Sequence, residues 1–199
     1  MHNESERREQ HRQRDRHDED FIDARIDDAQ RAGRDADSGA RDQEAVSTPG
    51  DDTVSMLHAP KGFLLLEDGT LFRGQLIGPL FPTVAEVVFT TNMSGYQEVF
   101  TDPSYQGQIV VMTAPQIGNY GVNLEDPESD GPQVAGIVVR ELSATHSNWR
   151  ATGGLRDWLI THGVPALTEV DTRRLTKHLR ATGVMRGVIG AGDTPSKEA

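Results

Sequence analysis

The sequence lacks cysteine altogether, although it runs to 199 residues. This absence excludes disulfides, thiolate metal sites and any cysteine nucleophile supplied by the chain itself. No run of about 18 apolar residues occurs, so no segment is predicted to span a membrane. No apolar stretch of about 7–15 residues follows the N-terminus, as a secretory signal would require, and we therefore expect a cytoplasmic protein.

Basic charge is also scarce. The chain has 20 Lys and Arg against 31 Asp and Glu, which gives a net charge of −11. This balance argues against nucleic acid or an anionic membrane as a partner. The sequence also has no glycine motif that cradles phosphate, no G-x-S-x-G nucleophile elbow and no histidines at metal-ligand spacing. The residues by themselves therefore predict no cofactor and no metal site.

Much of the negative charge belongs to one segment. Residues 1–55 contain 9 Arg against 16 Asp and Glu (9 − 16 = −7) and few apolar side chains. Such a segment cannot bury enough surface to offset its chain entropy, so we predict a disordered charged tail and linker over 1–57. A folded domain is predicted over 58–193 and a polar tail over 194–199. We also hypothesise that translation could start at Met56, which the intact mass of the native protein would test.

Strand patterns dominate the first half of the predicted domain. An Asp-Gly pair separates two apolar segments and predicts a β-hairpin over 62–78. A dense run of glycine, proline, Asn and Asp over 114–133 predicts a long loop. Further strands and one helical turn are predicted, in chain order, at Val84–Thr91 (strand), Asn92–Thr101 (turn), Gln108–Thr113 (strand) and Val134–Leu142 (strand).

The last third of the chain changes to helical periodicity. Leu155–His162 is an amphipathic helix pattern that Gly163 ends. Asp171 is a suitable N-cap for a second helix over Thr172–Thr182. Strands before and after this second helix are expected at Val164–Leu167 and Val184–Ile189. The pattern as a whole predicts an α/β domain in which two helices cover the sheets on one side.

The second of these helices carries a basic face, formed by Arg173, Arg174, Lys177 and Arg180. These side chains could contact a phosphate or an acidic partner. The alternative is a solvated helix face, because cations near a helix C-terminus are favoured by the macrodipole. The residue pattern leaves both interpretations open.

The stretch over 90–110, TTNMSGYQEVFTDPSYQGQIV, places many small, polar and aromatic residues between two apolar strands. Loops of this kind on a rigid sheet are where binding groups tend to lie. Ser104 and Tyr105 are the candidates, since a serine hydroxyl can both donate to and accept from an amide or a carboxylate. The alternative is a capped helix and a tight turn, in which Asp102 and Ser104 bond the local backbone.

Seven blocks of the chain occur in a recognisable order: LEDGTLFRG, EVVFTTNMSGYQEVFTDPSYQGQIVVMT, IGNYGVN, VAGIVVREL, SNWRAT, VDTRRLT and GVMRGVIGAGD. In this order and spacing they resemble the N-terminal domain of the small subunit of glutamine-dependent carbamoyl phosphate synthetase. The resemblance covers Lys61–Asp193, and its most specific block is GYQEVFTDPSY.

This resemblance implies a function. In that family the small subunit hydrolyses glutamine and passes ammonia to a large subunit, which uses bicarbonate and MgATP to make carbamoyl phosphate for arginine and pyrimidine synthesis. The resemblance implies a layered β/β/α domain of the "swivelling" type that helps to dock the large subunit. It also implies that Ser104, the serine of the DPSY motif, contributes to the glutamine site. The chain itself would carry no cofactor, because MgATP is used by the large subunit.

Two departures from the family limit what the chain is expected to do. The family's glutamine amidotransferase domain, with its Cys, His and Glu, has no counterpart before Ala199, so we expect no glutaminase activity from this chain alone. We expect another chain to supply that domain; the alternatives are a non-catalytic interaction module and a truncated remnant. In addition, Ala85 replaces a glycine that is usual in the family, which costs little unless its φ is positive.

Overall fold

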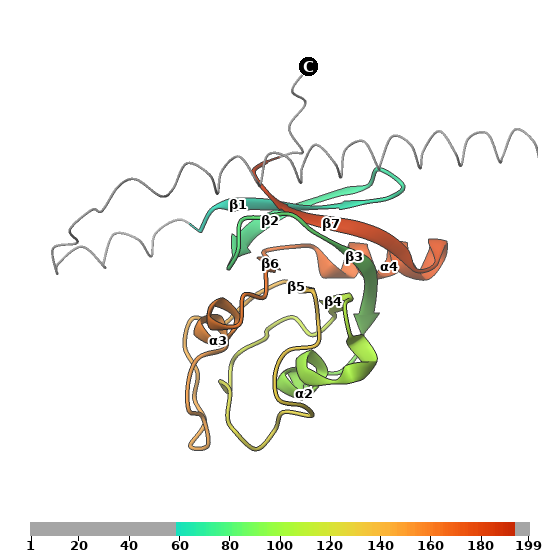
Figure 1. The fold of residues 1–199 in the computed structure, drawn as a ribbon. Helices are drawn as coiled ribbons and strands as arrows, with labels where there is room; N and C mark the ends of the chain where they lie inside the picture. The colour runs from blue at the N-terminus through green and yellow to red at the C-terminus, as the bar shows by residue number, and fades with distance from the viewer. Residues whose placement is uncertain (1–58, 194–199) are drawn as a thin grey trace, which may run out of the picture.

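A computed structural model describes residues 59–193 of the chain, which form a seven-strand barrel with helices packed around it (Figure 1). The tails predicted over 1–57 and 194–199, and the hypothetical start at Met56, lie outside the described residues. The elements are, in chain order, β1 (Lys61–Leu66), β2 (Leu71–Ile77), β3 (Thr83–Thr90), α2 (Tyr96–Thr101), the 3-10 helix η1 (Pro103–Tyr105), β4 (Ile109–Met112), β5 (Gly136–Val138), α3 (Leu155–Thr161), β6 (Ala166–Thr168), α4 (Thr172–Thr182) and β7 (Met185–Ala191).

The strands follow the order β1-β2-β6-β5-β4-β3-β7 around the barrel. The predicted hairpin is confirmed: β1 and β2 pair antiparallel, and Gly69 takes the positive φ of 83° that the turn requires. Strands β3, β4, β5 and β6 pair parallel to one another. The ring closes because β7 lies antiparallel between β1 and β3, and β2 pairs antiparallel with β6.

Two apolar clusters form on the two faces of this sheet. All seven strands contribute to the inner cluster, for example Leu64 of β1 and Ile109 of β4. The outer cluster contains the alternate residues of β4 and β5, such as Val110 and Ile137, together with α2, α3 and parts of the 114–133 loop. Strands β4 and β5 are therefore buried on both faces, which is typical of parallel strands.

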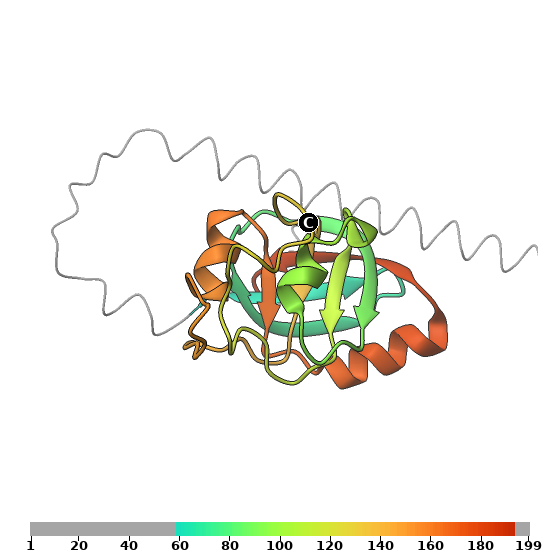
Figure 2. The same cartoon turned by 90° about the horizontal axis from the view of Figure 1, so that it is seen from below.

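The mixed α/β class is confirmed, but the two predicted helices do not cover one side together. Leu155 and Leu159 of α3 belong to the outer cluster, whereas Leu175 and Leu179 of α4 belong to the inner one. Figure 2 shows α3 and α4 at opposite edges of the barrel. The prediction of sheets covered on one side did not include closure into a barrel, and closure gives the two helices different faces to cover. The layered "swivelling" description stays a prediction.

Local signals in the sequence are confirmed where they are strongest. Asp171 caps α4, because its side chain accepts a hydrogen bond from the backbone N–H of Arg174 at 2.9 Å, and Gly183 ends the helix with φ 97°. Ala85 is in β3 opposite Gly187 and has no positive φ, so the alanine fits its strand. The strand predicted over Val134–Leu142 is wrong in extent: only Gly136–Val138 pairs, and beyond it the chain turns away toward the bridge between Ile117 and Leu142.

Candidate functional site

Helix α2 begins at a cap that the loop over 114–133 provides. The N-cap residue of α2 is Gly95, which has a left-handed φ of 76°. As a glycine it has no side chain that could cap the helix. Instead, the hydroxyl oxygen of Tyr120 accepts hydrogen bonds from the backbone N–H of Gly95 at 2.7 Å and of Tyr96 at 3.0 Å. Two of the N–H groups that every helix leaves unpaired at its N-terminus are satisfied in this way. The start of α2 therefore depends on a residue 24 positions away in the chain.

The two tyrosines form a buried pair beneath this cap. Their rings stack with centroids 4.1 Å apart, and the hydroxyl of Tyr96 donates to the carbonyl oxygen of Gly121 at 2.6 Å. Burial raises the pKa of both Tyr96 and Tyr120 above the ordinary value for tyrosine, so both phenols are neutral at physiological pH. The pair joins α2 to the loop without placing a charge in the core.

A second contact between α2 and the loop is made by Gln97, whose side chain is only 1% exposed. Its Nε2 donates to the carbonyl oxygen of Asn123 at 2.7 Å, and its Oε1 accepts from the backbone N–H of Asn123 at 2.9 Å. Both backbone groups of one loop residue are thus paired with a single side chain. An amide is suited to this role because it carries a donor and an acceptor side by side.

The C-terminal end of α2 is attached to the same loop. The hydroxyl of Thr101 donates to the carbonyl of Gln97 at 2.8 Å and accepts from the backbone N–H of Glu128 at 2.9 Å. Ser129 donates its hydroxyl proton to the carbonyl oxygen of Thr101 at 2.6 Å. The long loop predicted over 114–133 is confirmed, because no helix or strand lies within it. Its contacts with both ends of α2 hold it along the helix.

The candidate serine follows directly after this helix, in η1. Asp102 accepts a hydrogen bond on Oδ1 from the backbone N–H of Ser104 at 2.8 Å, with Pro103 at the first helical position. The hydrogen bond from the backbone N–H of Ser104 lowers the pKa of Asp102. The predicted capped turn is therefore confirmed. Ser104 is exposed to solvent, whereas Tyr105 packs against the outer apolar cluster. The structure separates the two candidates, and Ser104 is the one available to a ligand.

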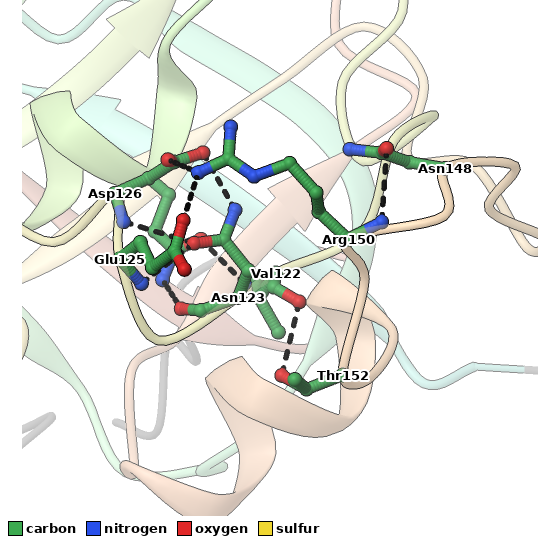
Figure 3. A network of polar contacts seen from close by, with 8 residues as sticks. Val122, Asn123, Glu125, Asp126, Asn148, Arg150 and Thr152 are labelled. Carbon is green, nitrogen blue, oxygen red and sulfur yellow. Dashed lines mark hydrogen bonds and ion pairs between the residues drawn. The ribbon is translucent and has the colours of Figure 1, made fainter.

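A polar network joins two loops on the surface (Figure 3). The guanidinium of Arg150 lies 2.8 Å from carboxylate oxygens of both Glu125 and Asp126, and these contacts raise its pKa. The side chain of Asn123 donates to Asp126 at 2.6 Å and accepts from two backbone N–H groups of the same loop. Exposed ion pairs of this kind stabilise a protein by little on their own, but a network holds two loops in one arrangement.

Two exposed apolar residues lie next to this network in the chain, and no pattern in the sequence indicated their exposure. Leu124 is 87% exposed and Trp149 is 92% exposed. They are adjacent in the chain to Glu125 and Arg150, respectively, so the ion pairs hold together the two loops that carry them. Tryptophan is rarely this exposed and is enriched at protein interfaces, so Trp149 is a candidate contact residue. Only the tertiary structure could distinguish this tryptophan from a core residue.

The remaining sequence candidates are not gathered into a site. No group of three or more His, Asp or Glu side chains within residues 59–193 is arranged to hold a metal ion. Among the helices of this range, none is both long and apolar enough to cross a membrane. The cations of α4 lie on a different element from Ser104, and the Arg174 guanidinium stacks 5.0 Å from the centroid of the Phe72 ring.

The family model and the curated relatives that match this chain belong to one family. The family model for the carbamoyl-phosphate synthase small chain, CPSase domain, matches residues 64–189. The carbamoyl phosphate synthase small chain of Akkermansia muciniphila is 53% identical over 137 residues, covering 69% of this chain and 37% of the relative. The small chains of Symbiobacterium thermophilum and Thermotoga maritima are 58% and 55% identical, covering 62% and 67% of this chain and 34% of each relative. The chain thus spans about a third of the length of these curated relatives.

Proposed function

The chain belongs to the carbamoyl phosphate synthase small-chain family, and from this membership we propose that it acts as the N-terminal domain of a small chain in glutamine-dependent carbamoyl phosphate synthesis. Its product would serve arginine and pyrimidine synthesis in the cytoplasm. Its partners would be a large chain, which uses MgATP and bicarbonate, and a glutamine amidotransferase domain that these 199 residues do not contain. The match over 64–189 is the observation that carries this proposal.

The absence of cysteine indicates which steps of the proposed reaction this chain could not perform. Glutamine hydrolysis through a covalent thioester needs a thiolate nucleophile, and this sequence supplies none. The proposed contribution of the chain is therefore to bind and to position. Ser104 would complete the glutamine site from outside the amidotransferase domain, and the capped turn after α2 would hold its exposed hydroxyl and backbone in place.

We expect Ser104→Ala to raise the KM for glutamine by roughly tenfold, because the loss of one hydrogen bond is worth about 1.4 kcal/mol. The measurement is carbamoyl phosphate formation by this chain together with an amidotransferase domain and a large chain. The rate with ammonia in place of glutamine should not change, since ammonia bypasses the glutamine site. Ser94→Ala, at an exposed serine before the other end of α2, is the matched control. An unchanged KM for glutamine would remove Ser104 from the site.

Leu124 and Trp149, on the two loops that the Arg150 ion pairs join, are the candidates for docking the large chain. Both side chains are strongly exposed, and the ion pairs hold their loops in one arrangement, so little loop entropy would be lost on binding. We expect Trp149→Ala to weaken binding to the large chain by about 30-fold, the effect of losing an interface residue worth about 2 kcal/mol. Calorimetric titration or surface plasmon resonance would measure it.

The control for this docking prediction is Ile160→Ala, which removes another exposed apolar side chain, 50% exposed on α3. Its affinity should equal that of the parent chain, and equal affinity for Trp149→Ala would place the interface elsewhere. The same preparation distinguishes the alternative function. A chain that binds the large chain but does not restore glutamine-dependent synthesis when the amidotransferase domain is added is a non-catalytic interaction module.

A further inference from the structure

Helix α4 presents a row of cations to solvent. Arg173, Lys177 and Arg180 are all exposed and are spaced at i, i+4 and i+7, which places them on one face of the helix. We call these three residues the basic stripe. Arg174 is separate from the stripe, because it points toward Phe72 on another side of the helix. The opposite face of α4 is anchored by Leu175 and Leu179 in the inner cluster.

The basic stripe has no counter-charge within residues 59–193. The ion pairs in this range are made by Lys61, Arg150 and His178, and none involves a member of the stripe. Like charges at i and i+4 on a helix destabilise it by a few tenths of a kcal/mol. The macrodipole accounts for Arg180 in the last turn but opposes Arg173 in the first turn, which contains no acidic residue. A solvated helix face therefore does not explain the whole stripe.

The chain itself contains a segment of complementary composition. Residues 18–28, DEDFIDARIDD, carry six carboxylates and one arginine, a net charge of 1 − 6 = −5, and three large apolar residues. Thirty residues (58 − 28 = 30) connect this segment to the first described residue, Ala59. For any chain of 30 residues, random-coil statistics give a root-mean-square span of about 30 Å, which is comparable with the diameter of a domain of this size. A segment tethered at this distance would have an effective concentration at α4 on the order of millimolar.

We propose that residues 18–28 bind the basic stripe of α4 in the same chain. The carboxylates neutralise Arg173, Lys177 and Arg180, which relieves their mutual repulsion. Val184, which is 61% exposed just after α4, provides an apolar contact for the aromatic or aliphatic side chains of the segment. In this state α4 is shielded from other anionic partners, so the segment acts as an internal competitor for that face.

Zero-length cross-linking of the full chain with a carbodiimide tests the proposal, because the sequence has only three lysines: Lys61, Lys177 and Lys197. We expect Lys177 to form amide links mainly to carboxylates of residues 18–28, as read by peptide mass spectrometry. The ion pair between Lys61 and Asp193, at 2.9 Å, provides an internal reference for the reaction. In 0.5 M NaCl, where screening is nearly complete beyond a few ångströms, the Lys177 links should fall at least fivefold relative to low salt.

Variants make the test specific. Neutralising Asp18, Glu19 and Asp20 together, to Asn, Gln and Asn, should reduce the Lys177 links to residues 18–28 at least fivefold. Neutralising three carboxylates outside the segment, Asp35, Asp37 and Asp42, should leave them unchanged. The double variant Arg173→Gln/Arg180→Gln retains Lys177 and should also lose most of the links, while the Lys61 reference persists.

Three results would overturn the proposal. One is Lys177 linked evenly to carboxylates throughout residues 1–55, which would indicate non-specific encounters. A second is cross-linking of Lys177 that persists both in the variant of the 18–28 segment and in the variant of the basic stripe. The third is linking only between different molecules in a mixture of ¹⁴N- and ¹⁵N-labelled chains, which would assign the stripe to a partner or to a second copy. Because none of these measurements involves glutamine or the large chain, their outcome is independent of the proposed function.

Discussion

Replacing Gly74 with alanine is expected to lower the free energy of unfolding by at least about 3 kcal/mol. Gly74 lies in β2, and a Cβ at this position would come within 2.2 Å of the carbonyl oxygen of Thr168 and 3.1 Å of Val170 Cγ2. The oxygen belongs to the backbone of β6, so it cannot move without disturbing the pairing of β2 with β6. Thermal unfolding followed by circular dichroism should show Tm lowered by about 10 °C.

The control for this substitution is Gly131→Ala. No atom lies within 4 Å of a Cβ built at Gly131, and its φ is not positive, so the methyl group meets neither a clash nor strain. Its stability should remain within about 0.5 kcal/mol of the parent chain. If the Gly74 and Gly131 variants unfolded at the same temperature, β2 and β6 would not approach as closely as the structure describes.

The second large effect is expected from Gln97→Leu, which should cost about 4 kcal/mol. Leucine has a similar volume, but it cannot bond the backbone N–H and carbonyl of Asn123, which is 6% exposed. Each buried backbone group left without a partner costs about 1–3 kcal/mol. We expect a lower midpoint in urea unfolding, together with faster hydrogen exchange at the Asn123 amide.

A matched substitution at the surface isolates this cause. Gln116→Leu removes a side-chain hydrogen bond to Glu141 that is exposed to solvent, where water replaces the lost partner. Its stability should change by less than about 0.5 kcal/mol. Equal effects at Gln97 and Gln116 would mean that the contact with Asn123 does not hold the loop against α2.

These contacts bear on Ser104 as well as on stability. Tyr120 caps the start of α2 and Gln97 attaches its first turn, while Asp102 and Ser104 follow directly after its last residue. From the residue pattern alone, a capped turn and a binding site are competing interpretations of Asp102 and Ser104. In the structure the capped turn exists and leaves Ser104 exposed, so the two interpretations are compatible.

The sequence alone was sufficient wherever the signal was local. The Asp-Gly turn indicated the β1–β2 hairpin, and Asp171 with Gly183 indicated both ends of α4, because caps and turns involve residues within a few positions of one another. The seven sequence blocks identified the family, which the match over 64–189 confirmed. The sequence did not reveal the contacts that position the candidate site. In the sequence, Tyr120 and Asn123 are recognisable only as parts of a long loop, because nothing local indicates which helix a loop packs against.

The absence of cysteine, the uneven distribution of acidic charge and the succession of strands along the chain can all be read from the sequence. Closure of the barrel, in contrast, is visible only in the folded structure. Alternation along a strand indicates which side chains share a face, but not which strand lies beside it. Here β7 completes the ring by pairing with β1 and β3, for example through Ile189 opposite Leu64, partners 125 positions apart in the chain (189 − 64 = 125). Because the barrel is closed, α3 packs in the outer cluster and α4 in the inner one. The exposure of Trp149 depends on how the loops outside the barrel fold. Both features result from packing between segments that are distant in sequence.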